Sequence, residues 1–340
     1  MKLLVLSASD IHQLLGYGQC ADAMRTALGA LASGQASQPL RSIVRFPAAT
    51  GLMGLMPARL AAGAPPAGEA AGSVDSAAYG LKAICITPGN PALGLDTHQG
   101  IVLLSEGQTG EPLAVLNASA ITEIRTAAVS VLATDVLARR GAGDLAVVGT
   151  GVQARAHVLA FARTRPLRRV RVAGRTPDRA EALAAALQPE MPTKIIVSPS
   201  VRDAVAGADI IVTATSSAEP VLRRDWIAAG AHINAVGACL PAARELDSAI
   251  IADAALFADS RESLLAESGD YLLAVADGLA GPGSIRAELG DVLSGQAPGR
   301  GSDQEITVFE SLGLAVEDLA AGLAVYRAAA GGAAGRWVEF

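Results

Sequence analysis

Cysteine and histidine are scarce in this chain of 340 residues, which has three of the former and four of the latter. The cysteines, Cys20, Cys85 and Cys239, are far apart and follow no paired spacing, so the sequence predicts neither a disulfide framework nor a zinc knuckle. The histidines form no cluster of metal-ligand type with carboxylates or cysteines. We therefore expect no bound metal.

Basic residues are not in excess either, because 27 lysines and arginines stand against 33 acidic residues, for a formal net charge of -6. Without a basic face, the chain is a poor partner for nucleic acid or an anionic membrane surface, and a small solute is the expected ligand. No stretch is long and apolar enough to cross a bilayer, and residues 1–10 lack the pattern of a signal peptide. We expect a cytoplasmic protein, and its 51% hydrophobic residues can form a substantial core.

The first part of the chain has the pattern of a small domain built around a sheet. A helix is predicted over residues 21–33, and a loop rich in Gly, Ala and Pro over residues 61–73. Strands are predicted over residues 79–87, 100–105 and 112–117. Their short connections favour an antiparallel or mixed sheet.

The period changes at Thr122, the predicted N-cap of a helix over residues 122–140. Beyond it, strands (144–148, 169–173, 194–197, 210–214) alternate with helices (152–163, 178–187, 201–206). This alternation predicts a parallel sheet covered by helices. Strands over residues 232–236 and 255–258 extend the sheet, and helical stretches follow as far as a last helix over residues 317–329.

A glycine-rich loop joins the first strand of this series to its helix, with the sequence Gly149-Thr150-Gly151-Val152-Gln153. A phosphate group needs backbone N–H groups at the positive end of a helix, and it needs glycine where the backbone approaches it closely. Ala154 completes the pattern Gly-x-Gly-x-x-Ala and allows the helix to pack tightly on the sheet. The pattern alone also suits a plain turn, but its place in a repeated strand-helix series favours a dinucleotide.

The end of the second strand of the series selects between the two nicotinamide cofactors. An NAD site has an acidic residue there, whereas this chain has Gly174, Arg175 and Thr176. Since Arg175 can bind a 2′-phosphate, we expect NADP(H), with NAD(H) as the alternative. On the other interpretation, Arg175 is a solvated surface charge like its arginine neighbours.

A series of motifs along nearly the whole chain resembles the ornithine cyclodeaminase and μ-crystallin family, which also includes alanine dehydrogenases and cyclic imine reductases. Besides the glycine loop, the motifs are Gly54-Leu55-Met56-Pro57, Leu81-Lys82, Thr87-Pro88-Gly89-Asn90, Ile121-Thr122-Glu123-Ile124-Arg125-Thr126-Ala127-Ala128, Ile233-Asn234-Ala235-Val236-Gly237, Arg244-Glu245-Leu246-Asp247 and Ile306-Thr307-Val308-Phe309-Glu310. The resemblance implies an α/β fold in which a Rossmann-type doubly wound parallel sheet, residues 122–310, binds NAD(P). This part is inserted into an α+β domain for substrate binding and dimerisation, residues 1–121 and about 311–340, so a homodimer is also implied.

The resemblance further implies that Arg41, Lys82 and Arg125 hold the substrate carboxylate beside the nicotinamide. Arg125 is expected at the start of a helix, where a bidentate guanidinium contact and the helix dipole both attract an anion. Lys82, one of three lysines, stands in an apolar run. It either points to solvent or is buried with a lowered pKa that suits proton transfer.

Further residues complete the predicted site. Thr97 and His98 are expected to border the substrate, and His98 is a substrate contact, a second proton donor or a residue with a structural hydrogen bond. Thr215, Val236 and Gly237 are expected to join the glycine loop in binding the cofactor.

Two departures from the family pattern decide the expected reaction. True cyclodeaminases have acidic residues before the Leu-Met-Pro turn and after the Val-Gly pair, and these positions are Gly54 and Cys239 here. Without the two carboxylates, nothing obvious binds a second amino group or acts as the base for ring closure. We assign Cys239 no role, since a lone cysteine is most often a small packed hydrophobe.

These features predict an oxidoreductase that reduces a C=N bond next to a carboxylate with NAD(P)H to give an amino acid. Lys82, or a water that it holds, is the expected catalytic acid. Expected substrates are pyrroline- or piperideine-2-carboxylate, or an acyclic imino acid. The alternatives are a cyclodeaminase-type lyase with internally recycled NAD, an oxidative dehydrogenase of alanine or of an amino-acid conjugate, and a crystallin-like protein that binds NADPH or a ligand without turnover.

Overall fold

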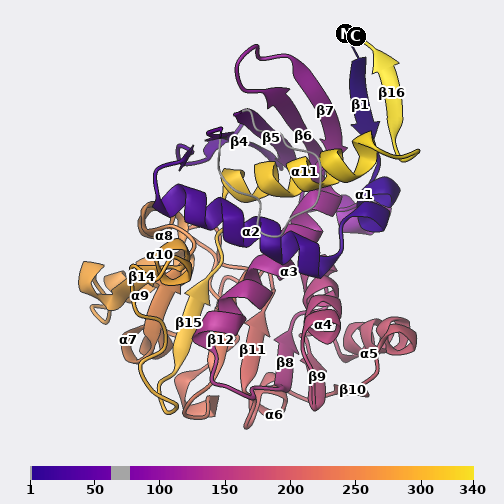
Figure 1. Ribbon diagram of the computed structural model, residues 1–340. Helices are drawn as coiled ribbons and strands as arrows, with labels where there is room; N and C mark the ends of the chain where they lie inside the picture. Colours follow the sequence, from indigo (N-terminus) through magenta and orange to yellow (C-terminus); the bar gives the residue numbers. More distant parts are fainter. Residues whose placement is uncertain (1, 63–76) are drawn as a thin grey trace. The chain divides into compact units, whose positions relative to one another are not determined.

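The computed structural model describes residues 2–62 and 77–340, and it divides into two compact units (Figure 1). Unit 1 consists of Met1–Arg125 and Leu314–Phe340, and unit 2 of Thr126–Gly313. The loop predicted over residues 61–73 lies almost wholly outside the described residues. In the part of the chain that is described, no helix has the length and apolar character needed to cross a membrane.

Unit 1 contains a mixed sheet, in agreement with the pattern of its sequence. The strand order is β16-β1-β7-β6-β5-β4-β2, with β3 also paired to β4. Only β1 and β7 run parallel among the described pairs of this sheet, and the others are antiparallel. Its strands are β1 (Lys2–Leu6), β2 (Ala36–Ser37), β3 (Ser42–Val44), β4 (Leu52–Leu60), β5 (Ala78–Ile86), β6 (His98–Glu106), β7 (Pro112–Asn117) and β16 (Arg336–Glu339).

One face of this sheet is covered by helix α11 (Ala315–Ala330), which packs on β4, β5 and β6 and against helix α2 (Tyr17–Ala32) (Figure 1). The helix comes very close to the sheet, because a Cβ added at Gly80 would lie 2.9 Å from the Cβ of Leu319. Side chains alternate between the two faces of β5, so Lys82 points to the same buried face as Gly80. A shorter helix, α1 (Ala8–Leu14), precedes α2.

Helix α3 (Ala118–Leu137) begins earlier than the sequence predicts, and the prediction of Thr122 as its N-cap was wrong. The side-chain oxygen of Asn117, at the end of β7, accepts a hydrogen bond of 3.0 Å from the backbone N–H of Ala120. This contact satisfies a free donor of the first turn, so the helix can start directly after the strand. Arg125 consequently lies well inside α3, and the expectation that the helix dipole adds to its attraction for an anion was also wrong.

Unit 2 has the predicted parallel sheet, whose described strands all run in one direction in the order β10-β9-β8-β11-β12-β15-β13-β14. The strands are β8 (Asp144–Val148), β9 (Arg169–Ala173), β10 (Ile195–Val197), β11 (Ile210–Thr213), β12 (His232–Ala235), β13 (Ala255–Ala258), β14 (Ile285–Glu288) and β15 (Thr307–Glu310). The helices are α4 (Val152–Thr164), α5 (Pro177–Leu187), α6 (Val201–Val205), α7 (Ser248–Asp253), α8 (Arg261–Glu267), α9 (Gly269–Ala276) and α10 (Leu289–Leu293). The order reverses at β8, and in doubly wound folds ligands bind at the carboxyl ends of the strands at this point.

Strands β14 and β15 were missed by the sequence analysis, which assigned only helical stretches after residue 258. Both have four residues, and β15 is buried on both faces between β12 and β13. So short a run shows no period, and its neighbours in the sheet decide its conformation. The exposed strand β16, which pairs antiparallel with β1, was missed as well.

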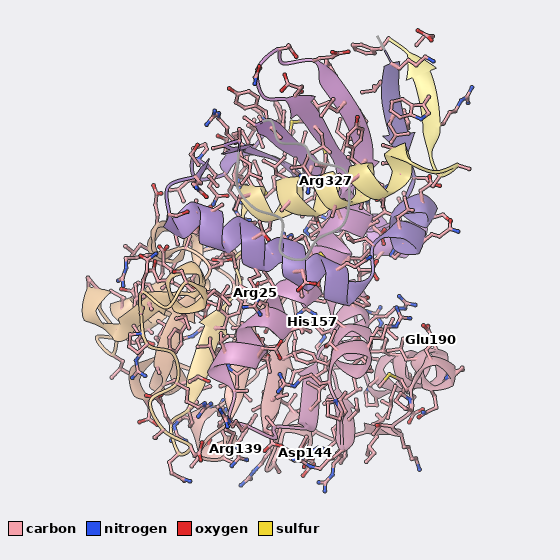
Figure 2. All side chains as sticks on the ribbon, viewed as in Figure 1. Arg25, Arg139, Asp144, His157, Glu190 and Arg327 are labelled. Atoms are coloured by element: carbon pink, nitrogen blue, oxygen red, sulfur yellow. The ribbon has the colours of Figure 1, made fainter. Side chains whose placement is uncertain are left out.

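The core of unit 2 includes a buried polar pair on its helices. His157 of α4 (Figure 2) is fully buried, and its ring nitrogens lie 2.7 Å from the carbonyl oxygen of Gln153 and 2.9 Å from the hydroxyl of Ser130. Burial lowers the pKa of His157 to about 4, so the ring is neutral at physiological pH.

Candidate active site

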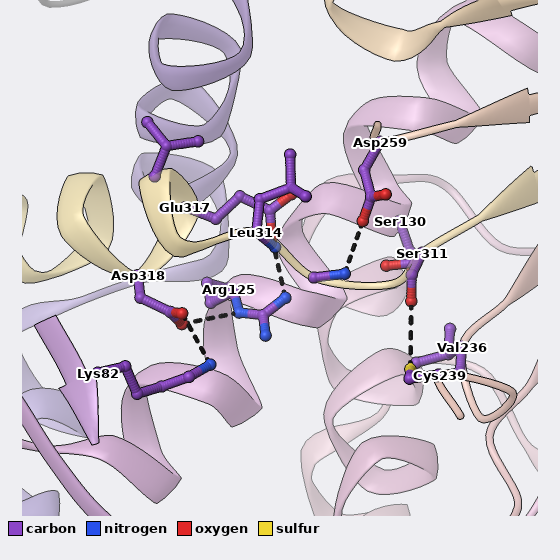
Figure 3. Close-up of polar contacts among 12 residues, drawn as sticks. Lys82, Arg125, Ser130, Val236, Cys239, Asp259, Ser311, Leu314, Glu317 and Asp318 are labelled. Atoms are coloured by element: carbon purple, nitrogen blue, oxygen red, sulfur yellow. Dashed lines mark hydrogen bonds and ion pairs between the residues drawn. The ribbon is translucent and has the colours of Figure 1, made fainter. Parts of the chain in front are cut away.

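Four charged side chains of unit 1 form a buried network, here called the charged cluster: Lys82, Arg125, Glu317 and Asp318 (Figure 3). The Nζ atom of Lys82 lies 2.7 Å from one carboxylate oxygen of Asp318, and Nε of Arg125 lies 3.1 Å from the other. A third contact of 2.9 Å joins Nη1 of Arg125 to Glu317. The exposed fractions of the side chains are only 3%, 5%, 0% and 1%, in the order named, so each charge depends on its partners for stabilisation.

Three elements bring the charged cluster together. Strand β5 points Lys82 to the face on which α11 packs, α3 supplies Arg125, and the first turn of α11 carries both carboxylates. Acidic residues are favourable at this end of a helix, and the side chain of Glu317 also accepts a hydrogen bond from the backbone N–H of Leu314 at 3.3 Å. The side chain of Gln38 accepts from the N–H of Val316 at 2.9 Å, which satisfies another donor of this turn.

Burial controls the ionisation of the charged cluster. The pKa of Lys82 is lowered to about 8, mainly by burial and also by the positive charges of Arg125 and Arg41, against the opposing effect of the Asp318 carboxylate. Burial also raises the pKa of Glu317, while the Arg125 guanidinium acts to lower it. The nearby thiol of Cys20 is fully buried, and its raised pKa keeps it neutral.

The structure thus unites two of the residues expected to hold the substrate, Lys82 and Arg125, and the interpretation of Lys82 as a solvent-facing lysine was wrong. Arg41 is partly exposed, and its charge acts on Lys82. His98 is exposed, and partial loss of hydration lowers its pKa, as do the charges of Lys82 and Arg125. Thr97 lies in the turn before β6, where its carbonyl oxygen accepts from the N–H of Thr87 at 2.9 Å.

Glu317 and Asp318 were missed by the sequence analysis, although they are half of the charged cluster. The available signal was a pair of consecutive acidic residues at the start of an otherwise apolar helix. A buried lysine and a buried arginine require anions nearby, but nothing local in the sequence says which carboxylates these are.

In unit 2, the glycine loop has the geometry that a dinucleotide requires. Gly149 has φ of +133°, and a Cβ there would lie 2.4 Å from the carbonyl oxygen of Ala214, so the position requires glycine. Gly151 is the N-cap of α4, and a Cβ there would meet nothing within 4 Å. Open space therefore lies directly at the N-terminus of a 13-residue helix, and the residues present fit a pyrophosphate.

The structure also places the other residues of the glycine loop. Val152 begins α4 and is 48% exposed, whereas Ala154 is fully buried against the sheet. The side chain of Thr150 lies close to Gly174, where an added Cβ would be 2.7 Å from its Cγ2. Gln153 uses its carbonyl oxygen to hold His157.

The candidate ribose site follows β9. Arg175 and Thr176 are both exposed, and Thr176 is the N-cap of α5. Within the described residues the structure records no ion pair for Arg175.

A buried carboxylate, Glu245, joins the ends of β11 and β12. It accepts hydrogen bonds from the N–H groups of Thr215 and Gly237, both at 2.6 Å, and from the hydroxyl of Thr213 at 2.9 Å. The N–H of Val236 bonds to the carbonyl oxygen of Thr213 at 3.0 Å. Burial raises the pKa of Glu245. The expected cofactor residues Thr215, Val236 and Gly237 therefore share one network, and Glu245 holds it together.

Gly54 and Cys239 are the two positions at which the sequence analysis expects an acidic residue in cyclodeaminases. Gly54 lies in β4, where it pairs with Ile84 and Ile43. The thiol of Cys239 lies 3.1 Å from the carbonyl oxygen of Val236 and 3.8 Å from that of Ser311 (Figure 3), so it donates to the backbone.

Comparisons with known proteins match this chain to one family over most of its length. A model of the ornithine cyclodeaminase/mu-crystallin family matches residues 1–333. The chain is 41% identical over 293 residues to the ketimine reductase mu-crystallin of Mus musculus, and the matched region covers 86% of this chain and 85% of that protein. It is 37% identical over 339 residues to the Delta(1)-pyrroline-2-carboxylate reductase of Bacillus cereus, covering 99% and 100%. The solved structure of the Delta(1)-pyrroline-2-carboxylate reductase of Thermococcus litoralis in complex with NADH and L-proline is similar with a TM-score of 0.91 and 34% identity, over 98% of this chain and 99% of that one.

Proposed function

Because the chain belongs to the ornithine cyclodeaminase/mu-crystallin family, we propose that it is an oxidoreductase that reduces a C=N bond next to a carboxylate and gives an amino acid. The observation that carries the proposal is the buried pairing of Lys82 with Asp318, beside Arg125. It provides a protonated amine of lowered pKa next to a guanidinium, as reduction of an imino acid needs. The substrates that fit are cyclic imino acids such as pyrroline- or piperideine-2-carboxylate. The similarity to a ketimine reductase and to a Delta(1)-pyrroline-2-carboxylate reductase supports this choice.

The proposed roles follow from the charges. Two carboxylates pair with Lys82 and Arg125 in the charged cluster, and the positive charge of Arg41, which acts on Lys82, adds to the attraction for an incoming carboxylate. Arg125 fixes the orientation of that carboxylate through its planar guanidinium. Lys82, or a water that it holds, keeps the imine nitrogen protonated, which makes the imine carbon electrophilic.

A nicotinamide cofactor, held by the glycine loop, supplies the hydride to that carbon when bound. Gly149 and Gly151 admit the pyrophosphate, and the N–H groups at the start of α4 bind it. Thr215, Val236 and Gly237 would contact the cofactor, and the network around Glu245 holds the backbone at Thr215 and Gly237 in place. We propose NADP(H) as the preferred form, because Arg175 is exposed at the end of β9 and no carboxylate takes its place there.

The proposal extends to a homodimer formed through unit 1. The face of the sheet opposite α11 carries exposed apolar side chains, with Val5, Tyr79 and Ile101 exposed by 40%, 44% and 45%. Apolar side chains grouped on one sheet face are typical of a protein interface.

The experiment is to measure NADPH and NADH oxidation by the purified protein with pyrroline-2-carboxylate and piperideine-2-carboxylate. Pyruvate with ammonia serves as the comparison substrate, and ornithine with NAD tests for ammonia release. We expect oxidation of NADPH with at least one cyclic imine. Oxidation of neither cofactor with any imine would refute the reductase, and ammonia release from ornithine would replace it by a cyclodeaminase.

A further inference from the structure

We propose that Asp318 is a positioning residue of this reaction: its two carboxylate oxygens hold the Lys82 ammonium and the Arg125 guanidinium in one arrangement and keep the lysine protonated. This inference rests on the proposed function, because it assigns Asp318 a role through Lys82. No contact of Asp318 itself with the substrate is needed.

The geometry supports this role directly. One carboxylate oxygen of Asp318 lies 2.7 Å from Nζ of Lys82, and the other lies 3.1 Å from Nε of Arg125 (Figure 3). The two cations come from different elements, β5 and α3, so the carboxylate couples a strand to a helix at the point where both present their charges. Because all three side chains are almost completely buried, bulk water stabilises their charges little, and each depends on its ionic contacts.

Glu317 provides a matched comparison in the same turn of α11. It is as deeply buried, but its ion pair at 2.9 Å is with Arg125, and its second contact is with the backbone N–H of Leu314. Loss of the Glu317 charge therefore disturbs Arg125 and the helix start, while the ion pair of Lys82 with Asp318 stays in place. The two neighbouring carboxylates should have different effects on catalysis.

The groups that face Lys82 define the expected pH effect. They are Asp318 and Glu317 from α11, Arg125 from α3, Arg41 from the segment between β2 and β3, and His98 from β6. Burial and the two arginines lower the pKa of Lys82, and the Asp318 carboxylate is the main influence that raises it. When that charge is removed, the lysine should lose its proton at a lower pH.

The test compares Asp318→Asn, Asp318→Glu and Glu317→Gln with the wild-type protein. Lysine labelled with ¹³C at Cε gives three signals, because the chain has only Lys2, Lys82 and Lys194, and a Lys82→Met sample assigns the signal of interest. We expect Lys82 to titrate near pH 8 in the wild type, at least one pH unit lower in Asp318→Asn, and within about half a unit of the wild type in Asp318→Glu and Glu317→Gln. The alkaline limb of kcat/KM should move with it.

The kinetic parameters separate positioning from general damage. We expect kcat of Asp318→Asn to fall at least tenfold at pH 8, while Glu317→Gln mainly raises KM. Asp318→Glu keeps the negative charge but changes its position. Its kcat/KM should therefore fall, while the alkaline limb of the pH profile of kcat/KM stays at the wild-type pH. Binding of NADPH and circular dichroism report whether each variant is folded.

Two results would overturn the inference. In one, Lys82 titrates at the wild-type pH in folded Asp318→Asn. In the other, which applies even if Asp318→Asn does not fold, Asp318→Glu has the kcat/KM of the wild type. If the wild type reduces no imine but the pKa of Lys82 falls in Asp318→Asn as expected, the proposed function is refuted, whereas the coupling of Asp318 to Lys82 is supported.

Discussion

Replacement of Gly149 by alanine is the sharpest test of the cofactor loop. The residue has φ of +133°, which costs a residue with a Cβ about 1–3 kcal/mol. The new Cβ would also lie 2.4 Å from the carbonyl oxygen and 3.0 Å from the carbonyl carbon of Ala214, which is backbone and cannot turn away. The loop can shift only by straining its bond from the Gly149 N–H to the carbonyl oxygen of Ala173, at 2.9 Å.

From these contacts we expect Gly149→Ala to lower the free energy of unfolding by about 2 kcal/mol or more, because overpacking adds to the backbone strain. For a unit of this size, that is a fall of roughly 4–8 °C in the melting temperature without cofactor. Since the displaced loop no longer presents its N–H groups correctly, the Kd for NADPH should rise at least about tenfold. Thermal unfolding by circular dichroism and titration of NADPH fluorescence measure the two effects.

Gly151→Ala is the matched control, two residues further along the same loop. Its φ is −89° and a Cβ would meet nothing within 4 Å, so the melting temperature should stay unchanged. The same Cβ would occupy the space proposed for the pyrophosphate, and the Kd for NADPH should rise. Wild-type affinity in Gly151→Ala would show that the pyrophosphate does not approach there, and a wild-type melting temperature in Gly149→Ala would refute the steric argument.

Three further predictions concern other parts of the molecule. Arg175→Ala should raise the Kd for NADPH by about 10- to 100-fold and leave that for NADH unchanged, and equal effects on both would refute the NADP assignment. Arg41→Ala should raise KM for the imino acid at least about tenfold, with partial recovery in Arg41→Lys; an unchanged KM would contradict its role. The pKa of His157 is lowered to about 4 from its ordinary value of 6.5, so its stabilising contribution is present above pH 6.5 and is lost as the pH falls toward 4. Between pH 7 and pH 5 the wild type should therefore lose about 2 kcal/mol of unfolding free energy more than His157→Gln does, and denaturant unfolding at the two pH values would disprove this if the losses were equal.

Local features of the sequence were sufficient for much of the fold. Strands β8, β9 and β13 and the place of the glycine loop between a strand and a helix were predicted correctly, because each of these strands is a short, largely apolar run bounded by turn or loop residues. The loop needs only glycines next to a strand and a helix, and all of these are neighbours in the chain. The predicted helix start at Thr122 was wrong, and the prediction of only helical stretches after residue 258 missed the strands over residues 285–288 and 307–310, because a side-chain cap and neighbouring strands decide these elements.

The sequence by itself thus determined the parallel sheet, the position of the glycine loop, and the absence of acidic residues at positions 54 and 239, which are Gly54 and Cys239. Only the tertiary structure decided that Lys82 is buried and that Asp318 and Glu317 neutralise it and Arg125. Asp318 and Arg125 are 193 residues apart, and they meet because α11 packs closely on β5 where Gly80 leaves room for Leu319. An ion pair of this kind depends on the packing of whole elements, which no local pattern of residues encodes.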